Sequence, residues 1–135
     1  MTPRRTPIVL ILATSLASCS ATTFDSSIST DTVAPTTTVL PVGTAAELLP
    51  ELVVAAAGLS ALIADHGDKF AAVERIEALW AAVHVEVAGT DRDIATEIEA
   101  EIAKGRRAAT LNRPGAADKV YRNLSALVQA YLAGA

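Results

Sequence analysis

From residue 44 onward, apolar residues recur every three or four positions, and this spacing predicts amphipathic helices. Thr44 and Glu47 have the spacing of a capping box, which predicts that the first helix starts there and runs to about Ala64. Its apolar stripe consists of Leu48, Leu52, Ala55, Leu59 and Leu62. Pro50 makes the first residue of this helix ambiguous. If the helix begins at Ala45, the proline ring lies past the first turn and kinks it, whereas a helix that begins at Pro50 tolerates proline as its first residue.

A tight turn is predicted at residues 65–68, with Gly67 at positive φ and Asp68 capping the next helix. The second helix is expected to end at about Ala88. The residues that it is expected to bury are Phe70, Val73, Ile76, Trp80, Val83 and Val87.

Gly89 is predicted to end the second helix and Thr90 to begin the third, with Asp93 in the capping-box position three residues after Thr90. The third helix carries one apolar face made of Ile94, Ile98, Ile102, Gly105 and Ala109. The small Gly105 permits a close helix crossing. Pro114, after Asn112 and Arg113, predicts the first turn of a fourth helix. That helix presents Val120, Leu124, either Leu127 or Val128, and Tyr131.

Four helices of about 20 residues joined by short turns pack antiparallel to their neighbours. The sequence therefore predicts an all-α fold, an up-down-up-down four-helix bundle formed by residues 44–135. The core is poor in large side chains, because only 4% of the residues are aromatic and much of the apolar content is alanine. A homodimer that exchanges helical hairpins stays an alternative arrangement.

Residues 19–43 differ sharply in composition from the helical part. Thirteen of residues 20–43 are Ser, Thr or Pro, and only Asp25 and Asp31 are charged. Such a segment buries too little apolar surface to offset its conformational entropy, so we expect a disordered tether. Its threonine cluster fits either a glycosylated stalk or an unmodified spacer.

Residues 1–18 have the features of a secretory signal peptide: a charged start with Arg4 and Arg5, then a short apolar run. The residues Leu16-Ala17-Ser18-Cys19 that follow resemble the lipobox of bacterial lipoproteins. This resemblance implies cleavage between Ser18 and Cys19, a diacylglyceryl group on Cys19 and often an N-acyl chain such as palmitate. An uncleaved membrane-anchor helix and a plain secretory signal without lipidation are the alternatives.

The lipobox resemblance implies a protein anchored in the cell membrane by acylated Cys19, facing the extracytoplasmic side. Cys19 is the only cysteine, so the exported domain forms no internal disulfide. The formal net charge is -4, and without Arg4 and Arg5 the 11 basic residues fall to 9 against 15 acidic ones. This balance argues against general nucleic-acid binding.

His84 is the best candidate for a metal or haem ligand, because Glu77 and Trp80 precede it on one helical face. A boundary histidine hydrogen-bonded beside a core tryptophan explains the same residues. Glu97, Glu99 and Glu101 are expected to form a solvated face. A basic group at the end of the third helix either contacts anionic headgroups or wall polymers, or complements the helix dipole; it consists of Lys104, Arg106, Arg107 and Arg113.

No nucleophile elbow and no phosphate-binding loop is present in the sequence. We therefore expect no enzymatic activity and no cofactor beyond the lipid on Cys19. The predicted function is that of a binding or scaffold module, with the membrane and an unidentified protein or cell-wall partner. The alternative is a metal- or haem-handling bundle that uses His84 and Glu77.

Overall fold

The computed structural model describes residues 40–134, which form four helices and contain no strand. These helices are α1 (Ala45–Ala64), α2 (Lys69–Thr90), α3 (Arg92–Thr110) and α4 (Pro114–Gly134). The all-α prediction is confirmed for this part of the chain. The predicted signal peptide, Cys19 and residues 20–39 of the predicted tether lie outside the described residues.

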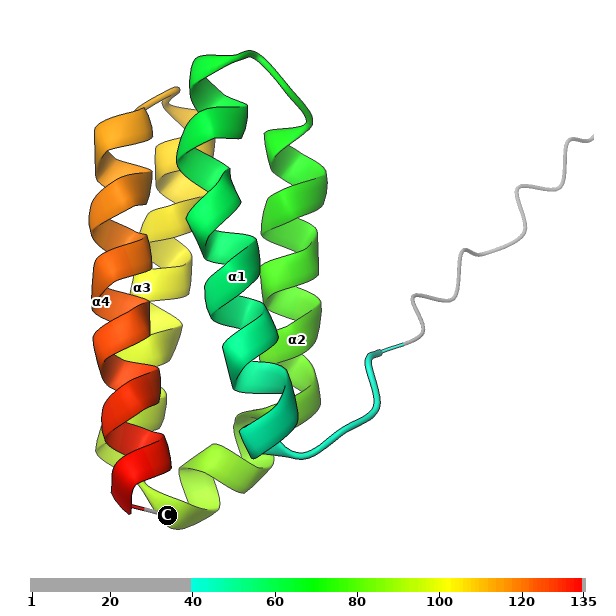
Figure 1. Cartoon of the computed structure of the whole chain (residues 1–135), viewed down its shortest axis with the longest axis vertical. Coiled ribbons are helices and arrows are strands. Elements are labelled where there is room, and N and C mark those ends of the chain that lie inside the picture. Colours follow the sequence, from blue (N-terminus) through cyan, green and yellow to red (C-terminus); the bar gives the residue numbers. More distant parts are fainter. Residues whose placement is uncertain (1–39, 135) are drawn as a thin grey trace, which may run out of the picture. The chain divides into compact units, whose positions relative to one another are not determined.

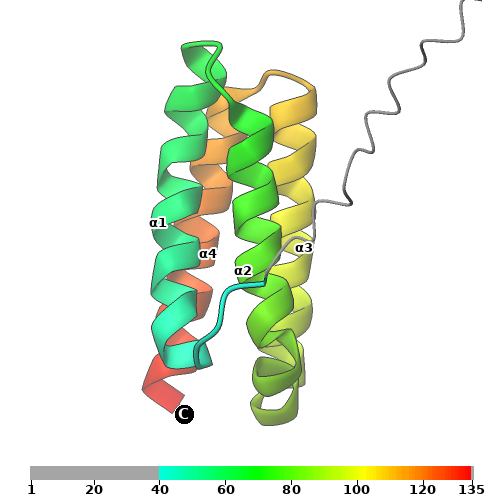
Figure 2. The ribbon, with the colours of Figure 1, turned by 90° about the vertical axis from the view of Figure 1, so that its right-hand side faces the viewer.

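The helices form an antiparallel four-helix bundle, as predicted. Each helix packs along its neighbours in sequence, and α4 closes the ring by packing on α1. The α1–α2 and α3–α4 turns lie at one end, whereas α1 begins at the other end, near the α2–α3 junction (Figures 1 and 2). Short connections of this kind favour antiparallel packing between helices that are adjacent in sequence.

The α1 helix supplies the largest share of the leucines in the core, and Leu49, Leu52 and Leu59 are fully buried. By length and composition it is also apolar enough to cross a membrane, with a mean hydropathy of 1.7, as core helices often are. The predicted stripe is slightly rotated: Ala56 and Ile63 are buried, whereas Ala55 and Leu62 lie at the edge of the core. The buried sector is wide because α1 faces two neighbouring helices.

The α1 helix begins at Ala45, so the structure selects the first of the two predicted starts and places Pro50 inside the helix. The carboxylate of Glu47 accepts both the backbone N–H of Thr44, at 2.9 Å, and its hydroxyl, at 3.1 Å. These bonds lower the pKa of Glu47, the backbone bond more than the hydroxyl bond. The N–H of Ala45 donates to Glu86 on α2, a tertiary cap that spacing within α1 does not predict.

Two helices end in the same capping motif, and neither uses glycine at positive φ. His66 has a φ of 55° after α1, and Asn112 has a φ of 51° after α3. In each case the next amide closes the turn: Gly67 donates to Leu62 O at 2.8 Å, and Arg113 to Ala108 O at 2.9 Å. The prediction of positive φ at Gly67 was therefore wrong by one residue. The Asp68 cap is confirmed by its bond to the Ala71 amide.

The α2–α3 junction is shorter than predicted. The α2 helix continues through Gly89 to Thr90, and Asp91 alone separates it from α3. One oxygen of Asp91 accepts the amides of Asp93 and Ile94, both at 3.0 Å, so Asp91 rather than Thr90 caps α3. Its carboxylate satisfies two otherwise unpaired amides from a single position.

Three further residues on α2, α3 and α4 can be compared with their predicted burial, namely Phe70, Gly105 and Val128. Phe70 is 53% exposed in the first turn of α2, where Lys69 Nζ lies 5.3 Å from its ring centre. Gly105 is buried, and a Cβ there would lie 3.4 Å from a methyl group of Val120 on α4, an ordinary van der Waals contact, so the packing does not depend on glycine at this position. Val128 rather than Leu127 is buried on α4.

Candidate functional site

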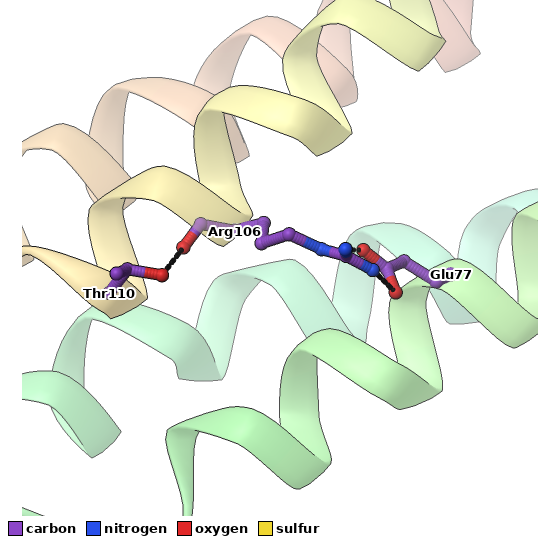
Figure 3. A network of polar contacts seen from close by, with 3 residues as sticks. All are labelled: Glu77, Arg106 and Thr110. Atoms are coloured by element: carbon purple, nitrogen blue, oxygen red, sulfur yellow. Dashed lines mark hydrogen bonds and ion pairs between the residues drawn. The ribbon is translucent and has the colours of Figure 1, made fainter.

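Glu77, a candidate ligand from the sequence, is engaged in an ion pair between α2 and α3. Arg106 donates its Nε to Glu77 Oε1 at 2.6 Å and a terminal nitrogen to Oε2, so the pair is bidentate (Figure 3). These hydrogen bonds, and then the charge of Glu77, raise the pKa of Arg106. Thr110 donates its hydroxyl to the Arg106 carbonyl at 3.0 Å. Both oxygens of Glu77 therefore have a partner within the bundle.

His84 lies against Trp80, with the two ring centres 5.3 Å apart and the ring planes at 78°. This edge-to-face contact agrees with the predicted position beside a core tryptophan, but among residues 40–134 the His84 ring has no hydrogen-bond partner, so the predicted hydrogen bond is not seen. Within residues 40–134, no group of three or more His, Cys, Asp or Glu side chains is placed to hold a metal ion. Metal or haem binding through His84 and Glu77 stays a prediction, and the contacts of Glu77 do not favour it.

Glu101 is buried on α3, so its prediction as part of a solvated face was wrong. The residue is only 7% exposed, the one charged residue among those buried in residues 40–134. Lys104 Nζ lies 2.5 Å from Glu101 Oε1, but Oε2 is buried and has no hydrogen-bond partner. A buried carboxylate oxygen without a donor lowers the stability of the fold, so a group that donated a hydrogen bond to Oε2 would be stabilising.

Glu101 lies in the α3–α4 groove, the surface furrow between these two helices. One part of the groove has a volume of about 380 Å³ and contains Glu97. The other has about 360 Å³ and runs toward the α3–α4 turn. Glu101, Lys104 and Asn123 line both parts. Two adjoining hollows of this size fall within the range of small-molecule sites.

The part of the groove near the turn is strongly basic. Its charged lining residues are Glu101, Lys104, Arg107, Arg113 and Lys119. Among the described residues, Arg107, Arg113 and Lys119 take part in none of the ion pairs within 4.0 Å. The groove therefore collects cations whose charge is available to a ligand.

The basic group predicted at the end of α3 is thus divided by the fold. Arg106 turns toward α2 and neutralises Glu77, whereas Lys104, Arg107 and Arg113 border the α3–α4 groove. Lys119 was missed because it belongs to the next helix. Glu101 was missed although the sequence carries a signal: it follows Ile98 by three residues and precedes Gly105 by four, which places it on the buried face.

The anchoring residues predicted from the sequence, Ser18 and Cys19, lie outside the described part of the chain. In the described part, the α3–α4 groove therefore contains a buried carboxylate oxygen without a hydrogen-bond partner. Both oxygens of Glu77, in contrast, are bonded to Arg106. Comparisons of the chain with protein-family models, with curated proteins and with solved structures found no match.

Proposed function

We propose that the chain is a lipid-anchored extracytoplasmic protein whose helical bundle is a non-enzymatic binding module. The lipobox residues Leu16 to Cys19 support the anchoring half of the proposal. Acylation of Cys19 supplies two or three chains, which suffice for stable membrane attachment, whereas one chain is marginal.

One observation carries the binding half, namely the α3–α4 groove. It combines three cations that have no ion-pair partner among residues 40–134 with a buried carboxylate oxygen that lacks a donor. The cations are exposed at the groove, where their charge can reach an anionic ligand, and the buried Glu101 oxygen is stabilised by a ligand that donates a hydrogen bond to it. Binding of a polar ligand is the function that uses them.

Anchoring is tested by expressing the full chain in a bacterial host that processes lipoproteins. Wild-type protein is expected in the membrane fraction, with the mass of the chain from Cys19 onward plus its acyl groups. The Cys19→Ala variant is expected in the soluble fraction or as unprocessed precursor, without acyl mass. Ser20→Ala, the neighbouring substitution, serves as the control and should remain anchored. Wild-type protein without acyl mass, or an acylated Cys19→Ala variant, contradicts the proposal.

A further inference from the structure

The part of the α3–α4 groove near the turn is positively charged, although the protein as a whole is acidic. The chain has a formal net charge of -4, yet this part brings four cations, Lys104, Arg107, Arg113 and Lys119, around the single carboxylate of Glu101. The apolar residues that line it are Ala108, Leu111, Ala116 and Val120. Clustered cations in a groove attract an anion, and low-dielectric apolar walls strengthen that attraction.

Glu101 adds a requirement that an anion alone does not meet. Its side chain is 9% exposed, and Lys104 occupies only one of its two oxygens. Oε2 is buried in this structure, so a ligand reaches it when neighbouring side chains move; Lys104 and Asn123, which line the groove with Glu101, are exposed and can do so. The other oxygen needs a donor, so the ligand must present a donor to Glu101 as well as negative charge to the cations.

We propose that the α3–α4 groove binds a phosphorylated polyol. Its phosphate lies among Arg107, Arg113 and Lys119, and one of its hydroxyls donates to Glu101 Oε2. A hydroxyl suits the site better than an ammonium group, because the surrounding cations repel a second positive charge. Glu101 and Arg107 are about 9 Å apart along α3, a separation that suits a sugar phosphate with its phosphate and hydroxyls at opposite ends. This inference rests on the proposed binding function.

The position of the groove favours a soluble or polymeric phosphate ester over a headgroup in the anchoring membrane. The basic part lies at the α3–α4 turn, whereas α1 begins at the opposite end of the bundle (Figure 1). The chain that leads to the proposed lipid anchor therefore joins the bundle at the end away from these cations. The groove is therefore tested with a soluble polyol phosphate, and phosphatidylglycerol vesicles serve as the comparison for a membrane headgroup.

The test is a nuclear magnetic resonance titration of the whole chain, purified in detergent, with two probes of equal charge. Glucose 6-phosphate carries hydroxyls, and methyl phosphate has the same phosphate without them. Glucose 6-phosphate should shift the side-chain amide of Asn123 and the amides near residues 104–119, and bind about tenfold more tightly than methyl phosphate.

Two variants separate the roles of the groups. Glu101→Gln keeps an acceptor oxygen but removes its charge, so it should reduce the preference for glucose 6-phosphate about threefold, while methyl phosphate binds no more weakly than before. The double variant Arg113→Gln with Lys119→Gln should weaken both probes at least fivefold. The matched controls, Glu99→Gln and Arg92→Gln, remove exposed charges outside the groove and should leave both affinities unchanged.

Equal binding of both probes to the wild-type chain would overturn the proposal. So would unchanged preference in Glu101→Gln, shifts spread over cations outside the groove, or binding to phosphatidylglycerol vesicles without binding of glucose 6-phosphate. Fractionation of the same variants keeps the two proposals separate. Membrane attachment of the wild-type chain without glucose 6-phosphate binding rejects the groove ligand alone, whereas glucose 6-phosphate binding by a wild-type chain that is not attached to the membrane rejects the anchor alone.

Discussion

The α2–α3 and α3–α4 interfaces each contain a carboxylate paired with a cation, but only one of them is complete. Between α2 and α3, Arg106 reaches across from the neighbouring helix and engages both oxygens of Glu77. Between α3 and α4, Lys104 lies on the same helix as Glu101 and engages one oxygen. The more exposed carboxylate is thus the better satisfied one, with 28% of the Glu77 side chain exposed against 9% for Glu101.

The difference follows from the chemistry of the two cations. A guanidinium presents two parallel N–H groups that match both oxygens of a carboxylate, whereas an ammonium group acts as a point charge. A complete pair joins two helices and leaves nothing for a ligand to contribute. An incomplete, buried pair costs stability, and it persists most readily where another molecule supplies the missing donor.

The difference between the two interfaces is tested most directly by replacing Glu101 and Glu77, one at a time, with methionine. Glu101→Met removes the unpaired buried oxygen and should stabilise the bundle by about 1–3 kcal/mol, because exposed Lys104 loses little when its partner disappears. Glu77→Met removes an ion pair whose groups are all bonded, so it should lower stability. The measurement is the free energy of unfolding of the full chain in urea.

Opposite signs for the two variants are the expected result. Glu99→Met is the control, because Glu99 is an exposed carboxylate on α3 and its replacement should change stability little. If Glu101→Met destabilises the chain as Glu77→Met does, Glu101 Oε2 has a donor in the folded protein and the two interfaces are equivalent.

The fold was predictable to the extent that it depends on local spacing. Leu52, Ile98 and Leu124 lie on predicted stripes and are fully buried, and the predicted caps at Thr44 and Asp68 are present. Phe70 was misplaced, because a residue in the first turn of a helix can follow the periodicity and still extend beyond the neighbouring helix.

The candidate site was less predictable, because it depends on contacts between helices. Periodicity places Glu101 on the buried face, but only the packed structure shows that Lys104 reaches one oxygen and that Lys119 of α4 joins the groove. The cap that Glu86 gives to Ala45 is a similar case, since 41 residues separate them. The lipobox assignment at Cys19 depends on sequence alone and stays a prediction.

A variant that stabilises the bundle at a site away from both interfaces shows whether ligand affinity depends on overall stability or on the groove residues themselves. His66 is exposed and holds a φ of 55°, where a Cβ is unfavourable. His66→Gly should therefore stabilise the bundle by about 0.5–1 kcal/mol, measured by urea unfolding. The affinity of the α3–α4 groove for glucose 6-phosphate should not change.

The control for this prediction is His66→Ala, which removes the imidazole but keeps the Cβ and should bring no comparable gain. A gain of the same size in both variants would show that the imidazole itself, rather than the backbone angle, is unfavourable at the α1–α2 turn.

The smallest expected effect concerns Glu47, a third carboxylate whose partners both come from one residue. Because its pKa is lowered in the folded chain, the stabilisation that it gives is complete above its unfolded pKa, near the usual 4.5, and is lost as the pH falls through the folded value. Thr44→Val removes the hydroxyl bond and keeps the backbone bond, so the pKa of Glu47 should rise only part of the way toward its usual value. A carbon-13 titration of the Glu47 carboxyl in the wild-type chain and in the variant checks this. No rise would show that the backbone N–H alone lowers the pKa.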